Sequence, residues 1–156
     1  MNSKSLFEQA SVLSSIAILI GTISPSPVFA ANINCNGTAD CIGTPGSDNM
    51  LGDGSTNNIF GDGPRGTAPT GAADRISGGG GADNIFAQGG DDKVDAGSGD
   101  DVVHGGSGND QIYGGTGNDV CLDGDDGYDR IDGGPGNDCI NGEGAFPAIP
   151  GEQTFL

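Results

Sequence analysis

A nine-residue pattern recurs through the centre of the chain and limits what the chain can fold into. Between Gly78 and Asn141 the segments GGGGADNIF, AQGGDDKVD, AGSGDDVVH, GGSGNDQIY, GGTGNDVCLD, GDDGYDRID and GGPGNDCIN follow one another without spacers. In the same register the pattern extends back to Gly43, giving ten units, the third with an insertion at Pro64–Thr70. Glycine falls mostly at positions one, two and four of a unit, aspartate at position six and an aliphatic residue at position eight. One such nonapeptide would be a weak signal, but ten in register are a strong one.

The aspartate at position six predicts a site for a hard cation. Nine of the ten units carry a carboxylate there, and the remaining unit carries Asn57. Calcium binds about six to eight oxygen atoms from carboxylates and backbone carbonyls, whereas softer metals favour clusters of histidine or cysteine. Glycines beside the aspartate allow positive φ, which turns backbone carbonyls toward a common point. We therefore expect the turns to bind Ca²⁺.

The aliphatic residue at position eight predicts a short strand with one inward side chain, because polar residues precede it at position seven. These ten residues are Met50, Ile59, Ile76, Ile85, Val94, Val103, Ile112, Leu122, Ile131 and Ile140. A disordered, low-complexity segment is the competing interpretation, but such a segment has no reason to restore an aliphatic residue in every unit. Because the core would be thin, we expect calcium binding and folding to be one event.

Taken together, these residues resemble the RTX (repeat-in-toxin) family of haemolysin-type calcium-binding repeat proteins, whose repeat is G-G-x-G-x-D-x-U-x. The resemblance implies an all-β fold, namely a right-handed parallel β-roll, or β-solenoid, with two repeats per coil and about five coils. It also implies that each turn stacks on the turn two units later, with an ion between the two turns.

This stacking implies two ladders of metal-binding aspartates. One ladder would contain Asp74, Asp92, Asp110 and Asp129, and the other would contain Asp83, Asp101, Asp119 and Asp138. We expect the position-four glycines to contribute as well, and these are Gly81, Gly90, Gly99, Gly108, Gly117, Gly127 and Gly136. Asp48 and Asn57 are weaker candidates, because Asn57 lacks the charge and the insertion interrupts the next unit. Three gaps in each ladder predict about six Ca²⁺ ions, and at most about eight.

The charge of the chain restricts its partners. The formal net charge is −17, and only five residues are basic. Such a surface repels nucleic acid and anionic membranes, so we expect neither nucleic acid binding nor direct membrane binding by the mature form. Calcium ions are the expected partners, we expect a monomer, and no protein or surface partner is identified.

Residues 1–30 resemble a secretory signal peptide in composition. Lys4 lies in a polar start, an apolar run covers Val12–Ile23, and the small residues Val28 and Ala30 precede an expected cleavage point. A membrane anchor is the alternative, but the run is interrupted by polar residues and is shorter than the ~20 residues that a span needs. We expect a mature protein that is secreted to the extracellular space or the cell surface. It would contain an N-terminal cap (31–42), the roll (43–141) and a C-terminal tail (142–156).

The chain has four cysteines, an even number that suits an oxidising compartment. Of the three possible pairings we favour Cys35 with Cys41 and Cys121 with Cys139. Cys139 occupies position seven, and Cys121 lies beside position seven two units earlier, so this pair would lie on adjacent rungs of one edge. A zinc site is the alternative, but the chain lacks a Cys-x-x-Cys pair and a histidine cluster.

These features favour a function other than catalysis. The chain has one histidine, His104, which we expect to be a solvent-exposed repeat residue, and it has no nucleophile-elbow motif. We expect a secreted calcium-binding β-roll that folds on binding Ca²⁺ after export and acts as an extracellular structural or surface module. A calcium-dependent adhesin or surface-binding solenoid, including an ice-binding one, is the alternative, although Thr44 and Thr116 are isolated within the units. A hydrolase is a third alternative.

Overall fold

The computed structural model describes residues 30–36, 40–64 and 71–142. In this part of the chain the regular structure consists of strands alone. One sheet contains β1 (Asn32–Asn34), β3 (Asn49–Leu51), β5 (Arg75–Gly80), β7 (Lys93–Ser98), β9 (Gln111–Thr116) and β11 (Arg130–Asp132). The other contains β2 (Asp40–Ile42), β4 (Asn58–Phe60), β6 (Asn84–Gly89), β8 (Val102–Ser107), β10 (Cys121–Asp126) and β12 (Ile140–Asn141). Among these described residues, no helix is long and apolar enough to cross a membrane.

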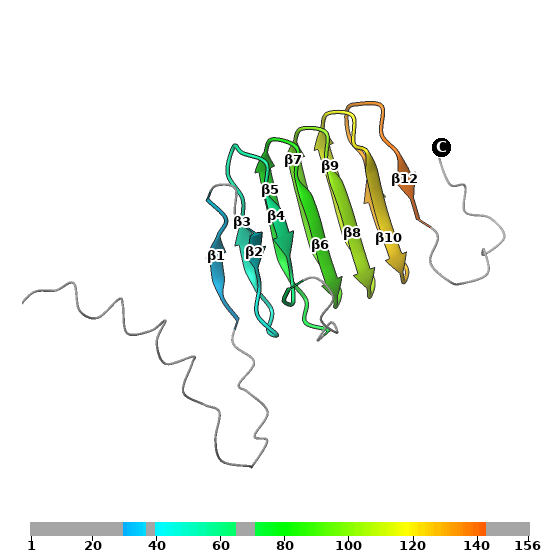
Figure 1. Cartoon of the computed structure of the whole chain (residues 1–156). Helices are drawn as coiled ribbons and strands as arrows, with labels where there is room; N and C mark the ends of the chain where they lie inside the picture. Colours follow the sequence, from blue (N-terminus) through cyan, green and yellow to red (C-terminus); the bar gives the residue numbers. More distant parts are fainter. Residues whose placement is uncertain (1–29, 37–39, 65–70, 143–156) are drawn as a thin grey trace, which may run out of the picture.

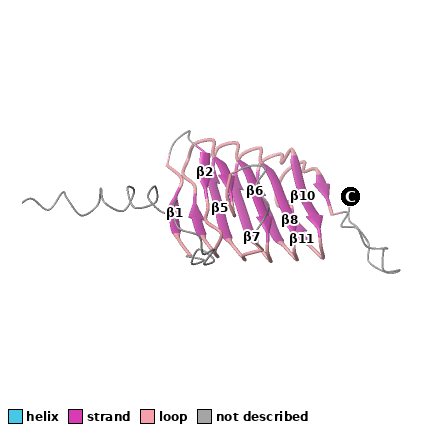
Figure 2. Ribbon diagram, turned by 60° about the horizontal axis from the view of Figure 1, so that its bottom comes forward, coloured by secondary structure: helices cyan, strands magenta, loops and turns pink. Residues whose placement is uncertain are grey.

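Each sheet consists of parallel strands, and the two sheets face each other along the length of the molecule (Figure 1). Their strand orders are β1-β3-β5-β7-β9-β11 and β12-β10-β8-β6-β4-β2. Successive strands along the chain therefore alternate between the sheets, and the turns that join them lie at the two edges of the roll (Figure 2). The fold is a parallel β-solenoid with two repeats in each coil, as the sequence predicted.

The register follows the length of the repeat. Ile76 pairs with Val94, and Val94 pairs with Ile112, so complete units bring residues eighteen positions apart into contact. The insertion widens this spacing, because Met50 pairs with Ile76. The ten-residue unit GGTGNDVCLD widens it by one, because Val103 pairs with Leu122. In that unit Cys121 occupies position seven and the extra residue is Val120, which is exposed, whereas the sequence analysis had placed the extra residue at Cys121.

The aliphatic residues at position eight form the core. They stack in one column per sheet, and the following are at most 3% exposed: Met50, Ile59, Ile76, Ile85, Val94, Val103, Ile112 and Leu122. The prediction fails at the C-terminal end, where Ile131 is only partly buried and Ile140 is 40% exposed. Within the described residues, which end at residue 142, no further coil follows to cover these two side chains.

The strands are longer than predicted. A full strand such as β7 runs from position seven of one unit to position three of the next, and Gly97 and Ser98 continue the ladder with Gly115 and Thr116. Position one therefore also points inward, and Ala87 and Ala96, which replace glycine there, are fully buried. Each repeat thus places two residues in the interior, although one of them is usually glycine.

The roll has about six coils, one more than predicted. The additional coil comes from the segment predicted as an N-terminal cap, because β1 pairs with β3 and β2 pairs with β4. A disulfide joins Cys35 to Cys41, as predicted, and both cysteines are buried at this end of the core. The predicted signal peptide up to residue 29, residues 65–70 of the insertion and the tail from residue 143 lie outside the described residues.

Candidate calcium-binding turns

The position-six aspartates lie in the turns, immediately before the strands, and stack in two ladders. In each ladder the backbone N–H of one aspartate donates to Oδ1 of the aspartate one coil later. The bond from Asp74 to Asp92 is 2.7 Å long, and the bond from Asp83 to Asp101 is 2.8 Å long. Equivalent bonds of 2.8–3.1 Å join the rest of both ladders down to Asp129 and Asp138. One carboxylate oxygen of each aspartate is therefore used to hold the coils together.

In seven of these aspartates the second carboxylate oxygen has no hydrogen-bond partner among the described residues. Within the described residues, Oδ2 is buried and makes no hydrogen bond in Asp74, Asp83, Asp92, Asp101, Asp110, Asp119 and Asp129. A buried carboxylate oxygen without a compensating partner is costly, because burial removes its hydration. Seven such oxygens in two rows indicate that a cation belongs beside them.

The first rung of each ladder differs from the others. The backbone N–H of Asp48 donates to Asp74 and that of Asn57 donates to Asp83, so both residues extend the ladders. However, Oδ2 of Asp48 accepts hydrogen bonds from the backbone and hydroxyl of Thr44, and Oδ1 of Asn57 accepts one from the N–H of Asp53. These oxygens already have protein donors, which agrees with their being the weaker candidates.

The position-four glycines place carbonyl oxygens along the same turns. Gly117 has φ of 146°, and a Cβ built on it would lie 1.8 Å from the carbonyl oxygen of Gly99, one coil earlier. Gly108 has φ of 137°, and a Cβ built on it would lie 1.9 Å from the carbonyl oxygen of Gly90. Glycine is thus needed for two reasons, because it allows positive φ and because a carbonyl of the neighbouring turn occupies the space of a side chain.

Burial perturbs the titration of the ladder aspartates. It raises the pKa of Asp74 to about 7 and that of Asp92 to about 8, although a backbone N–H donor to each carboxylate opposes the rise. Burial also raises the pKa of Asp101 and Asp110 to about 6. The pKa values of Asp83, Asp119 and Asp129 shift in the same direction for the same first cause. Neighbouring carboxylates raise these pKa values further. The negative charges of the ladders are therefore not balanced by positively charged groups of the described protein.

The sequence analysis missed a second set of acidic and amide side chains at position five. The backbone N–H of Asn109 donates to Asp91 and that of Asn118 donates to Asp100, each at 2.8 Å. These side chains are exposed, so they brace the turns from outside. They follow the same repeat as position six, and the preference for Asp and Asn at position five was the available signal.

Asp62 was also missed. Its carboxylate is buried, and its charge raises the pKa of both Asp74 and Asp92. It lies at position two of the interrupted third unit, where the repeat otherwise favours glycine, so the pattern offered no signal for it. Its backbone N–H donates to Oε1 of Gln88 at 2.8 Å.

The predicted disulfide between Cys121 and Cys139 is absent from the structure. Both cysteines carry free thiols, that of Cys121 half-buried and that of Cys139 exposed. They precede the register pair Leu122 and Ile140, so they are neighbours across two parallel strands as expected.

The donor set fits Ca²⁺. Carboxylate and carbonyl oxygens are the ligands that this ion prefers, and the described turns supply both, without imidazole or thiol groups among the ladder residues. The family model of the RTX calcium-binding nonapeptide repeat (4 copies) matches residues 70–103, 89–121 and 122–145. No curated protein and no solved structure matches the chain.

Proposed function

We propose that this chain, which carries RTX calcium-binding nonapeptide repeats over residues 70–145, folds its roll on binding Ca²⁺ after export and acts as a secreted structural or surface module. The observation that carries this proposal is the double row of buried Oδ2 atoms without hydrogen-bond partners. Repeats of this family are generally structural and non-enzymatic. We propose the same for this chain, with the aspartate ladders used for ions and not for catalysis.

The position of the carboxylates supports binding of ions between coils. Asp92 and Asp110 lie one coil apart and each carries an orphaned Oδ2, so an ion between them relieves the desolvation of both. The rungs from Asp74 to Asp129 and from Asp83 to Asp138 define three gaps each, which supports about six ions.

The composition of the core supports coupling between binding and folding. Apart from the aliphatic columns, the buried apolar side chains of the described residues are two alanines, the two cysteines of the disulfide and Phe60, so apolar burial per residue is small. The net charge of −17 adds repulsion that bound cations relieve at neutral pH. An ion that binds the folded roll and not the unfolded chain adds its binding free energy to the stability of the fold.

Export is supported by the composition of residues 1–30 and by the Cys35–Cys41 disulfide, which suits an oxidising compartment. Calcium is abundant outside cells, and extracellular calcium modules work with Kd values of roughly 10⁻⁴ to 10⁻³ M. Such an affinity would keep the chain unfolded before export and fold it afterwards.

A calcium titration of the full chain tests the proposal. We expect circular dichroism to show a gain of strand structure on adding Ca²⁺, reversal by EGTA, and a stoichiometry of about six ions by calorimetry. Mg²⁺ at the same concentration is the control, because its demand for regular six-fold geometry suits these turns poorly. A chain that shows the same dichroism with and without Ca²⁺ would contradict the coupling.

A pair of adjacent substitutions tests the role of the ladder. Asp101→Asn keeps the Oδ1 that accepts from the N–H of Asp83 but removes the charge, so we expect calcium binding to weaken by about ten-fold or more at the sites beside it. Asp100→Asn is the matched control, since Asp100 is exposed and its Oδ1 serves the N–H of Asn118. Equal calcium binding by the two variants would exclude Asp101 as a ligand.

A further inference from the structure

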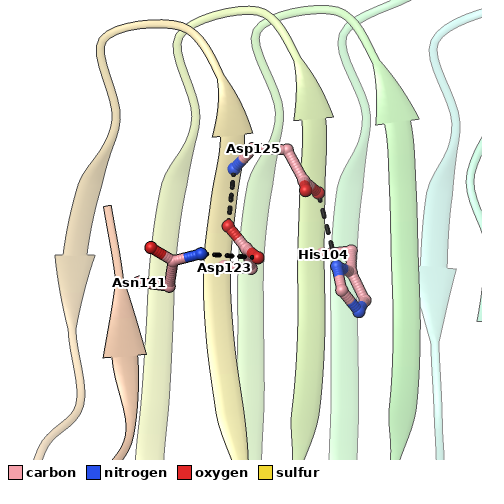
Figure 3. Close-up of polar contacts among 4 residues, drawn as sticks. All are labelled: His104, Asp123, Asp125 and Asn141. Carbon is pink, nitrogen blue, oxygen red and sulfur yellow. Dashed lines mark hydrogen bonds and ion pairs between the residues drawn. The ribbon is translucent and has the colours of Figure 1, made fainter. Parts of the chain in front are cut away.

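The outer face of the sheet that contains β8 carries a row of side chains unlike the rest of the roll. Phe86, His104 and Asp123 are register partners on β6, β8 and β10, and Asn141 on β12 follows Asp123. Asp125 lies two residues after Asp123 on β10, so both side chains emerge from the same face of the sheet. Figure 3 shows His104, Asp123 and Asp125 converging on one region of this face.

The three side chains are close enough to share one ion. Nδ1 of His104 lies 3.4 Å from Oδ2 of Asp125. Each of the three residues offers one ligand atom, and these atoms all lie within 4.8 Å of one another. The side chains of His104 and Asp125 are 36% and 37% exposed, so an ion can reach them from solvent.

The site is held in place by its surroundings. The ring of His104 stacks on that of Phe86, with centroids 5.2 Å apart and planes inclined by 5°, so His104 is half-buried and oriented and not freely exposed as the sequence analysis expected. Oδ1 of Asp123 accepts the backbone N–H of Asp125 at 3.0 Å, and Oδ2 of Asp123 accepts Nδ2 of Asn141 at 3.0 Å (Figure 3). Each carboxylate oxygen retains a lone pair for a further partner.

Asp125 also breaks the repeat. It occupies position two, where glycine is usual, and holds φ of 61°. Its register partner Gly106 adds no side chain beside it. Burial and the charge of Asp123 raise the pKa of Asp125, while His104 opposes the rise, so the pair of carboxylates is only partly compensated.

We propose that His104, Asp123 and Asp125 bind a divalent transition-metal ion of the Zn²⁺ class, at a site separate from the calcium-binding turns. Imidazole nitrogen is a preferred ligand of Zn²⁺ and its neighbours, whereas Ca²⁺ takes oxygen ligands. Two carboxylates and one imidazole make a three-ligand set, which leaves a further position for water or for a group of another molecule. The ion neutralises the negative charges of Asp123 and Asp125.

The test uses the full chain without an added histidine tag, saturated with Ca²⁺ and then titrated with Zn²⁺. His104 is the only histidine of the chain, so the imidazole nitrogen resonances in NMR report on this site alone. We expect a shift of these resonances at one equivalent of Zn²⁺. His104→Phe preserves a ring that stacks on Phe86 but removes the ligand nitrogen, and it should weaken Zn²⁺ binding by about ten-fold or more. Calcium stoichiometry should not change.

Two further variants separate the site from the fold. Asp125→Gly restores the repeat glycine and relieves the positive φ, so it should keep or improve folding while weakening Zn²⁺ binding by about ten-fold or more. Gln88→Gly is its matched control, because Gln88 is also a position-two residue with positive φ, 81°, but it is not one of the three proposed ligands and its Oε1 accepts the N–H of Asp62. It should leave Zn²⁺ binding unchanged.

The free thiols require a separate control. A variant with both Cys121→Ser and Cys139→Ser should still bind Zn²⁺ at His104. Three results would each overturn the proposal. The first is undiminished Zn²⁺ binding in His104→Phe or Asp125→Gly, and the second is loss of Zn²⁺ binding in the double serine variant. The third is a histidine NMR spectrum that does not change on adding Zn²⁺. In the last case His104 and Asp125 form an ion pair and nothing more.

Discussion

A single position-six aspartate performs two tasks with its two oxygens. In Asp92, for example, Oδ1 accepts the backbone N–H of Asp74 from the previous coil, and Oδ2 is buried without a hydrogen-bond partner. The first contact is geometric and survives without charge, whereas the second oxygen is costly to bury until a cation arrives. The residue therefore makes stacking possible and at the same time makes it dependent on ions.

The pH dependence follows from the raised pKa of these carboxyls. In the folded state the pKa of Asp74 is about 7 and that of Asp92 about 8, against an ordinary value of 3.8, so the folded roll binds more protons than the unfolded chain between these limits. Their stabilising effect is fully present below about 3.8 and is lost as pH rises through about 7–8. We expect the calcium-free chain to show more strand dichroism at pH 4 than at pH 8.

Calcium competes with protons for the same carboxylates. In the presence of Ca²⁺ we therefore expect the stability of the folded roll to fall, and not to rise, as pH decreases. We expect calcium affinity to fall as pH drops from about 8 to about 6, with protons released on binding. Calorimetry in two buffers of different ionisation enthalpy measures this release, and Asp92→Asn should reduce it. Identical heats in both buffers would show that the ladder is already ionised.

At the scale of the element, each turn follows directly from the strand before it. Strands such as β9 extend through positions one to three, and the turn occupies positions four to six. The turns stack so closely that the carbonyl oxygen of one position-four glycine lies where the Cβ of the next would be. A side chain at position four therefore displaces the whole turn and, with it, the aspartate two residues later.

Gly117→Ala tests this close stacking. Its φ of 146° and the Gly99 carbonyl oxygen at 1.8 Å from a built Cβ predict a loss of at least about 1–2 kcal/mol in the free energy of unfolding. Thermal unfolding at saturating Ca²⁺ measures the loss. Gly54→Ala is the control, because nothing lies within 4 Å of its built Cβ, and we expect a change within about 0.5 kcal/mol. Similar stability of the two variants would contradict the tight stacking of the turns.

At the scale of the whole molecule, each coil depends on its neighbours. Strand β8 pairs with β6 and β10 alone within its sheet, so stability is close to a sum over adjacent coils. The two ends differ: a disulfide closes the first coil, whereas the last exposes Ile140. The described basic residues Arg75, Lys93 and Arg130 all lie in the sheet opposite His104, on β5, β7 and β11.

This asymmetry predicts the order in which the roll opens. In hydrogen exchange at saturating Ca²⁺ we expect the strongest protection in β6 to β9 and the weakest in β11 and β12. Reducing the Cys35–Cys41 disulfide should raise exchange in β1 and β2 and leave β6 to β9 unchanged. Exchange that is uniform along the roll would indicate one cooperative unit in place of coupled coils.

The repeat alone determined the parts of this protein that recur. The period predicted a turn aspartate and an inward aliphatic residue in every unit, and the resemblance to RTX proteins, with two repeats per coil, implied that Asp74, Asp92 and Asp110 stack in one ladder. The same stacking places Ile76, Val94 and Ile112 in one core column. The Cys35–Cys41 disulfide was also predicted, as one of the two favoured cysteine pairs.

The tertiary structure decided what happens where the repeat is broken or ends. It placed β1 and β2, from the segment predicted as a cap, in a further coil, exposed Ile140, and left Cys121 and Cys139 with free thiols. It also brought His104 beside Asp123 and Asp125 through a coil lengthened by one residue. These outcomes depend on which side chains become neighbours across unequal or terminal coils, and a pattern within one unit carries no information about that.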